Sequence, residues 1–184
     1  MLEDRKFIFI DGAVSPYNNP AFQLFLMTTL KAYRLNWPTG EDKMLLVSVG
    51  TGTDNYADLT LRPSRMHLFY HAPRLPLVLM AAANTEQDLL CRAFGRCVFG
   101  DPIDREVGDL QGEAGDGAVD PKLFTYVRYN VELSQSGLDA MGLGDIRMKD
   151  VGPLDAFRRI DALRRIGQAA AGKVQKRHFA KFLT

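Results

Sequence analysis

The stretch MLLVSVGTG, residues 44–52, decides the fold of this chain. Five of its first six residues are apolar, which predicts a short strand buried on both faces. Gly50-Thr51-Gly52 then stops that strand with a turn. Strands that are apolar on both faces are typical of a parallel sheet covered by helices, so the stretch predicts an α/β protein.

A second strand and a helix are predicted before this stretch. Residues 7–10, FIFI, form another apolar and β-prone run, and Asp11-Gly12 stops it. Asn19 is a suitable N-cap and Pro20 a suitable first residue for the helix that follows. The apolar face of that helix is predicted to comprise Phe22, Phe25, Leu26, Thr29, Leu30 and Tyr33. Strand, helix and strand within about 45 residues predict a parallel βαβ unit.

The elements after residue 52 are less regular. Residues 66–97 have a helical pattern that is interrupted at Pro73, where one helix should end, and at Pro76, where another should begin. Residues 100–121 are rich in glycine and acidic residues and predict a long loop, a kind that is more often functional or mobile than accidental. Residues 124–133 alternate between apolar and polar, which predicts a half-buried edge or antiparallel strand.

Two helices are expected near the C-terminus. A short one should lie around residues 138–141, with Ser136 as its cap, and a basic amphipathic helix should occupy residues 153–184. The predicted apolar face of the second comprises Leu154, Phe157, Ile160, Leu163, Ile166 and Val174. Residues 155–184 hold eight basic and two acidic residues, whereas residues 1–154 hold 15 basic and 20 acidic ones. Such a helix is either a solvated face, the simpler interpretation, or a contact with an anionic membrane surface.

Length and composition indicate one folded domain covering residues 1–184. Hydrophobic residues make up 46% of the chain and the net charge is +1, which excludes disorder as the dominant state. No apolar run reaches the roughly 18 residues that a membrane span requires, and no secretory signal is visible. Cys91 and Cys97 are predicted to be reduced core thiols of a cytoplasmic protein.

Asp11 is the first candidate for chemistry. A carboxylate at the end of a buried parallel strand points into the crevice where α/β proteins bind ligands. Beside a serine hydroxyl it can act as a general base, and Gly12 would allow the backbone to turn sharply there. The simpler interpretation is a turn aspartate followed by a helix cap at Asn19.

Three other patterns are weaker. Gly50-Thr51-Gly52 begins like a dinucleotide-binding loop but lacks its third glycine, so tight backbone packing is the preferred interpretation. His67 and His71 have a spacing that can hold zinc, but no glutamate lies between them, and core or surface positions are favoured. His178 is interpreted as a surface residue. No serine lies in a G-x-S-x-G elbow; Ser48 is the nearest match and lies inside a strand.

Together these motifs resemble the C-terminal part of the patatin-like phospholipases. The resemblance rests on FIDGAV at residues 9–14, NNP at residues 18–20 and LLVSVGTG at residues 45–52, with weaker similarity in FTYVRY at residues 124–129 and around residues 138–143. It implies a three-layer α/β/α fold with a mainly parallel or mixed sheet. It also implies a Ser–Asp dyad that hydrolyses lipid esters without a catalytic histidine.

By this resemblance Asp11 is the dyad aspartate, and Gly12-Ala13 fits the family's Asp-Gly-Gly/Ala motif. Asn18, Asn19, Gly50, Thr51 and Gly52 would shape the site around it. The nucleophile motif and the glycine-rich oxyanion turn normally precede this point in the family, so the chain is expected to be the C-terminal segment of a longer hydrolase and inactive alone. Neither a metal nor another cofactor is implied.

Other functions remain open at this stage. The chain could be a non-catalytic α/β binding or interaction module, or a nucleotide-binding α/β domain that uses Gly50–Gly52. The expected partners are a lipid ester, a peripheral membrane surface contacted by the basic terminal helix, and a second copy of the chain paired through an exposed sheet edge. No nucleic-acid partner is expected.

Overall fold

The chain folds around a small, open, parallel sheet. The computed structural model describes residues 8, 11–12, 15–53, 75–112, 119–153 and 156–183. Three strands lie in the spatial order β1 (Leu45–Val49), β3 (Thr125–Tyr129) and β2 (Arg96–Phe99). Both pairings are parallel. The predicted α/β class and the predicted parallel sheet are therefore confirmed.

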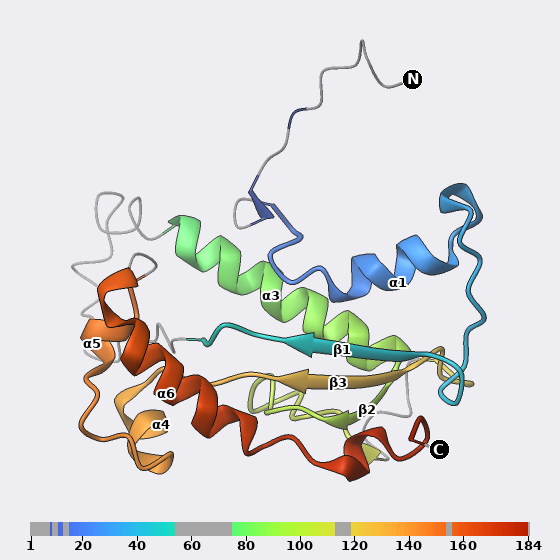
Figure 1. Cartoon of the computed structure of the whole chain (residues 1–184). Helices are drawn as coiled ribbons and strands as arrows, with labels where there is room; N and C mark the ends of the chain where they lie inside the picture. The colour runs from blue at the N-terminus through green and yellow to red at the C-terminus, as the bar shows by residue number, and fades with distance from the viewer. Residues whose placement is uncertain are drawn as a thin grey trace.

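Two helices cover one face of this sheet, and others gather at its carboxyl end (Figure 1). α1 (Ala21–Thr29) and α3 (Leu75–Phe94) pack on the same face and contact each other. α4 (Gln135–Ala140) and α5 (Met148–Val151) lie beyond the strand ends, and α6 (Ile160–Ala171) follows them. The described residues also include the 3₁₀ helices η2 (Lys31–Tyr33), η5 (Phe157–Arg159) and η6 (Lys176–Phe179).

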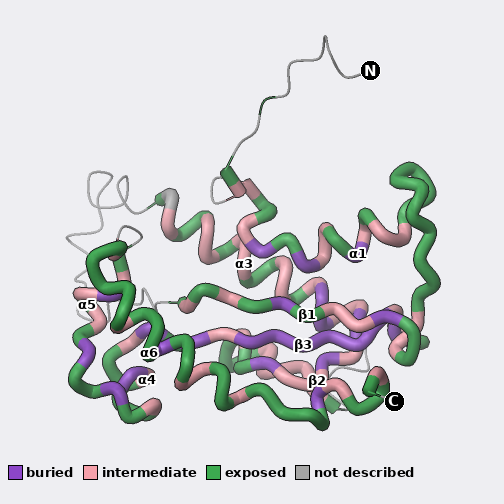
Figure 2. The backbone as a smooth tube through the Cα atoms, in the orientation of Figure 1, coloured by how far each residue is buried: buried purple, intermediate pink, exposed green. Residues whose placement is uncertain are grey.

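The hydrophobic core has two parts. The first lies between α1, α3 and the sheet, where Phe25 packs against Phe124 with 4.7 Å between the ring centroids, and Phe22 packs against Phe94. The second lies at the carboxyl end of the sheet and joins Val131 and Leu133 to α4, α5 and Ile166 of α6. The buried positions in Figure 2 follow β3 from the first part into the second.

The strand predicted as an edge or antiparallel strand is the central, parallel one. Every residue of β3 is buried, so the edge prediction was wrong. Its polar side chains are accommodated by partners inside the protein: Thr125 Oγ1 donates to Glu41 O at 2.6 Å, and Arg128 donates to Ser48. An alternating pattern therefore marks two differently lined faces here, not one face open to water.

β1 and β2 are the two outer strands of the described sheet, with β3 between them. Val47 and Val49 of β1 are exposed, Val49 at 73%, so the prediction that this strand is buried on both faces was wrong. The strand predicted at residues 7–10 falls mostly on residues outside the described ranges. Its one described member, Ile8, belongs to no strand and is 89% exposed, which contradicts the buried position predicted for it.

Helix positions were predicted better than helix ends. α1 begins one residue after Pro20, and Asn19 Oδ1 accepts a hydrogen bond from Ala21 N–H at 3.4 Å. α3 begins at Leu75, close to the predicted start at Pro76, but it ends at Phe94, so Cys97 lies on β2 and not on a helix. α4 is capped by Ser134, which accepts from Gly137 N–H at 3.0 Å, and not by Ser136.

Both cysteines are free and buried, as predicted. Burial raises the pKa of the Cys97 thiol to about 11 and also raises the pKa of Cys91. Thiols with such high pKa values hold little thiolate at neutral pH, which makes them weak nucleophiles.

The basic terminal helix is shorter than predicted. α6 ends at Ala171, and its buried face consists of Ala162, Ile166, Ala169 and Ala170. The expected apolar residues Phe157, Ile160 and Leu163 are exposed, and Leu154 lies outside the described residues. The small alanine side chains let α6 pack closely on the second core, and Gly172, a poor helix former, follows the last residue of the helix.

Several bases of this region form ion pairs with acidic residues far away in the sequence. Arg165 pairs with Asp145 at 2.6 Å, Lys173 with Asp101 at 3.1 Å and Lys181 with Glu41 at 3.0 Å. These pairs partly neutralise the basic region. None of the described helices is both long and apolar enough to cross a bilayer.

His178 is buried, contrary to the prediction of a surface position. Its ring stacks on Phe99 with centroids 4.5 Å apart, and its Nδ1 lies 2.8 Å from the Tyr129 hydroxyl. Gln175 N–H also donates to Nδ1, at 3.4 Å, so Nδ1 is the unprotonated, accepting nitrogen. η6 thus packs on the face of the sheet opposite α1, with His178 as its anchor.

Two glycine-to-alanine changes should have opposite effects on stability. A Cβ at Gly95 would overlap the ring of the fully buried Phe124 and lie 2.7 Å from Cys91 O, so Gly95→Ala should lower the free energy of unfolding by roughly 1–3 kcal/mol. Gly167 is exposed on α6 with nothing near its Cβ position, so Gly167→Ala should raise it by about 0.5–1 kcal/mol. Urea denaturation measures both, and a stable Gly95→Ala protein would contradict the packing described for the first core.

Stability should depend on His178 at mildly acidic pH. Burial, assisted by the charge of Arg177, lowers the pKa of folded His178 below 6.5, its ordinary value. Below pH ~6.5 the unfolded state therefore binds a proton that the folded state resists, and stability falls as the pH falls. Between about pH 7.5 and about pH 5.5, wild-type protein should lose more unfolding free energy than His178→Gln in urea titrations. Equal losses in the two proteins would show that His178 is not held neutral.

Candidate functional site

A cavity of about 230 Å³ lies at the carboxyl ends of β1 and β3, against the start of α1. Open α/β sheets bind their ligands at this edge. Five residues expected to shape the site, which are far apart in the sequence, line this one cavity: Asn18, Asn19, Gly50, Thr51 and Gly52. Leu24, Ser48 and Arg128 also line it.

The two glycines of this cavity are packed tightly against the continuation of β3. A Cβ at Gly50 would overlap the Asn130 side chain, and one at Gly52, whose φ is +104°, would meet Leu133 Cδ1 at 2.5 Å. Their amides are already used: Gly50 N–H donates to Tyr129 O at 2.8 Å and Gly52 N–H to Asn130 Oδ1 at 3.1 Å. A phosphate-binding loop needs free amide donors, so these contacts argue against a nucleotide phosphate at Gly50–Gly52.

Three buried side chains form a hydrogen-bond chain along the cavity. Arg128 Nη1 donates to Ser48 Oγ at 2.6 Å, and Ser48 Oγ donates to Asn19 Oδ1 at 3.0 Å. Ala21 N–H also donates to Asn19 Oδ1, at 3.4 Å, and a backbone N–H can only donate, so Oδ1 is the accepting atom of Asn19 and Ser48 donates its proton to it. Ser48 is thereby fully engaged inside β1, which agrees with its lack of a nucleophile elbow in the sequence.

Two side chains of this hydrogen-bond chain are not fully paired within the described residues. Asn19 is only 4% exposed, and its Nδ2 has no hydrogen-bond partner. Arg128 is 8% exposed and forms no ion pair with any acidic residue in the described ranges. Buried charges and buried donors are normally paired, so these two groups mark an unusual site.

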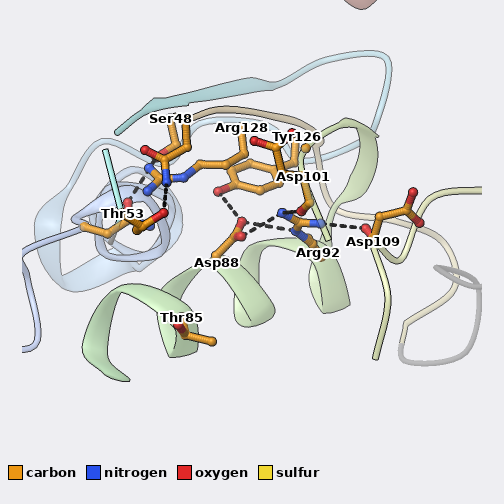
Figure 3. A network of polar contacts seen from close by, with 12 residues as sticks. Ser48, Thr53, Thr85, Asp88, Arg92, Asp101, Asp109, Tyr126 and Arg128 are labelled. Atoms are coloured by element: carbon orange, nitrogen blue, oxygen red, sulfur yellow. Dashed lines mark hydrogen bonds and ion pairs between the residues drawn. The ribbon is translucent and has the colours of Figure 1, made fainter. Parts of the chain in front are cut away.

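A larger cavity, of about 490 Å³, adjoins the first and shares Thr53, Asn84 and Arg128 with it. Its floor contains a second buried arginine, shown in Figure 3. Arg92 donates from Nη2 to Asp88 Oδ2 at 2.7 Å and from Nε to Asp88 Oδ1 at 3.1 Å. It also donates to the carbonyl oxygens of Asp101 and Asp109, so it fastens the loop after β2 to α3.

The charges of this second network balance each other inside the protein. Burial alone would lower the pKa of Arg92, but the Asp88 carboxylate outweighs burial and raises it. Burial and Asp88 together raise the pKa of Tyr126, whose hydroxyl donates to Asp88 Oδ1 at 2.8 Å. Arg92 therefore stays charged and Tyr126 stays protonated, and both satisfy Asp88. This network holds structure together, whereas Arg128 keeps an unbalanced charge.

The remaining expected site residues lie outside these cavities or outside the described ranges. Asp11 is exposed, and Gly12 O accepts from both the N–H and the hydroxyl of Ser15 at 3.0 Å. A Cβ at Gly12 would lie 3.4 Å from Tyr17 O and 4.0 Å from Asn18 Cα, so the Asp11-Gly12 turn adjoins Asn18 of the smaller cavity. Ala13, His67 and His71 are outside the described residues. Within the described ranges, no three metal-ligating side chains cluster.

The sequence did not identify Arg128 and Arg92 as site residues. A signal for Arg128 was present, because a charged residue interrupts a β-prone run, but the alternating pattern suggested a solvent-facing side chain. Arg92 and Asp88 have the i, i+4 spacing of an ordinary surface pair on a helix. Only their burial against β3 distinguishes them.

Comparisons of the chain with protein-family models, with curated proteins and with solved structures find no match. The resemblance to patatin-like phospholipases consequently rests on the sequence motifs alone.

Proposed function

We propose that this chain is the aspartate-bearing, C-terminal part of a patatin-like serine acyl hydrolase that cleaves lipid esters. One observation carries the proposal: the motifs at residues 18–19 and 50–52, on which the resemblance depends, line one cavity at the carboxyl edge of a parallel sheet. The Asp11-Gly12 turn lies directly against Asn18 of that cavity. Active sites of α/β proteins form at this edge.

In the proposed reaction, the Asp11 carboxylate accepts the proton of a serine hydroxyl, and the serine oxygen attacks the ester carbonyl. The tetrahedral oxyanion collapses, the alcohol leaves with a proton, and water then hydrolyses the acyl-serine. The serine and the amides that hold the oxyanion are proposed to come from sequence preceding residue 1. Asp11 is exposed in this chain.

A non-catalytic ligand-binding module is the second candidate. It is favoured by the unbalanced charge of Arg128 and the unpaired amide of Asn19, because both can bind a ligand without reacting. Nucleotide binding through Gly50–Gly52 is less well supported, since the amides of both glycines already donate to β3 and to Asn130.

Membrane contact through α6 and self-association are further parts of the proposal. The exposed Phe157, Ile160 and Leu163 lie next to basic residues, which is an arrangement suited to an anionic lipid surface. Among the described strands, β1 pairs on one side alone, and we propose that its other edge pairs with a second copy of the chain.

Asp11 should be essential for ester hydrolysis in the protein expressed from its complete reading frame. Asp11→Asn removes the general base but keeps the side-chain shape, so kcat for p-nitrophenyl ester hydrolysis should fall by about 100-fold or more. The 184 residues alone should give no turnover, because they contain no serine at a nucleophile elbow.

Asp161→Asn is the matched control, since it neutralises another exposed carboxylate, on α6, and should leave kcat unchanged. Two results would contradict the proposal: undiminished hydrolysis by Asp11→Asn, or Asp11-dependent turnover by the 184 residues alone. A reading frame that begins at Met1 and yields no turnover would favour the binding module.

A further inference from the structure

Two residues that line the smaller cavity, Arg128 and Asn19, carry N–H donors that the described part of the protein leaves unused. The direction of the hydrogen-bond chain excludes the alternative orientation of the Asn19 amide. If Nδ2 replaced Oδ1, it would face the Ser48 hydroxyl and Ala21 N–H, both of which donate to that position. The unpaired atom of the buried Asn19 side chain is therefore Nδ2, a hydrogen-bond donor.

Arg128 adds a full positive charge beside this donor. Its guanidinium uses Nη1 for Ser48 and has no hydrogen bond from Nε or Nη2 in the described part of the chain. Nη2 lies 2.9 Å from the position of a Cβ at Gly50, at the cavity wall. The start of α1, a nine-residue helix whose N-terminal end carries partial positive charge, lines the same cavity.

We propose that the smaller cavity binds an oxyanion, a carboxylate or a phosphate group, between the Arg128 guanidinium and Asn19 Nδ2. An oxyanion satisfies both groups at once, because it supplies the missing negative charge and accepts the unused N–H bonds. A neutral ligand would leave the arginine uncompensated, and a cation would be repelled by it. The inference needs no serine and holds whether or not the chain belongs to a hydrolase.

Two sources of the oxyanion can be distinguished by the walls of the cavity. Ala21 and Leu24 provide apolar surface near the polar end, which suits the carboxylate of an acyl chain. A phosphate, free or in a lipid head group, would use the polar end alone. Inorganic phosphate and octanoate therefore serve as the two probes, and octan-1-ol serves as the neutral one.

Isothermal titration of the 184-residue chain with each probe, at one ionic strength, tests the proposal. At least one anion should bind saturably and octan-1-ol should not. Asn19→Asp keeps the acceptor for Ser48 and Ala21 but replaces the orphan donor with a carboxylate oxygen that neutralises Arg128. This variant should weaken anion binding about tenfold or more, while its Tm should not fall, because it gains an internal charge pair.

Asn36→Asp is the matched control, because it adds the same charge at an exposed position that lines neither cavity. Its dissociation constant for the anion should lie within about twofold of the wild-type value, and that result would also exclude a general effect of the added charge. Arg128→Gln, which keeps a donor for Ser48 but removes the charge, should lose binding as Asn19→Asp does.

Binding of phosphate alone would identify a phosphate site, and binding of octanoate alone would identify an acyl carboxylate site. The proposal is overturned if neither anion saturates, if octan-1-ol binds as well as octanoate, or if Asn19→Asp and Arg128→Gln bind like wild type.

Discussion

The hydrogen-bond chain from Arg128 through Ser48 to Asn19 is the constraint on which the candidate site depends. It joins the central strand β3, the outer strand β1 and Asn19, which precedes Pro20 at the start of α1, so it fixes the walls of the smaller cavity. Arg128 and Ala21 N–H can only donate, so Asn19 Oδ1 accepts from Ser48 and Ala21, and the direction of each hydrogen bond is set. That direction leaves a buried amide donor unpaired at a cost of roughly 1–3 kcal/mol. Proteins tolerate such costs mainly where a ligand is bound or a reaction is carried out.

The two buried arginines show why this cavity differs from its neighbour. Arg92 is balanced by Asp88 and by two backbone carbonyls, and it holds α3 and the loop after β2 in place. Arg128 lies in the same layer, yet no carboxylate in the described ranges balances its charge. A structural arginine is normally neutralised by its own protein, as Arg92 is. This difference in pairing between Arg92 and Arg128 distinguishes a structural network from a candidate binding site.

Local sequence patterns predicted the elements that depend on neighbouring residues. The apolar run before Gly50 became β1, Pro20 and Asn19 marked the start of α1, and Pro76 marked the start of α3. These features follow from short-range propensity and capping. The resemblance led us to expect residues 18–19 and 50–52 at one site, and they do line one cavity.

Features that depend on distant partners were not predicted. β3 is central because its polar residues find acceptors on β1 and in the segment before it, Ser48 and Glu41, and the alternating pattern could not reveal those partners. His178 is buried because it packs against Phe99 and Tyr129, and α6 places an alanine face against the second core. In each case the sequence supplied the residue type, and a contact across the chain determined its environment.

The most direct test of the site observes its two donors during an anion titration. In NMR spectra of the 184-residue chain, the Arg128 Nε–H and Asn19 Nδ2–H₂ resonances should shift together and saturate as octanoate or phosphate is added. Side-chain resonances of Arg92, which is already balanced by Asp88, should remain in place. Resonances of Arg128 and Asn19 that stay fixed while the anion binds elsewhere, or that do not respond at all, would contradict the account.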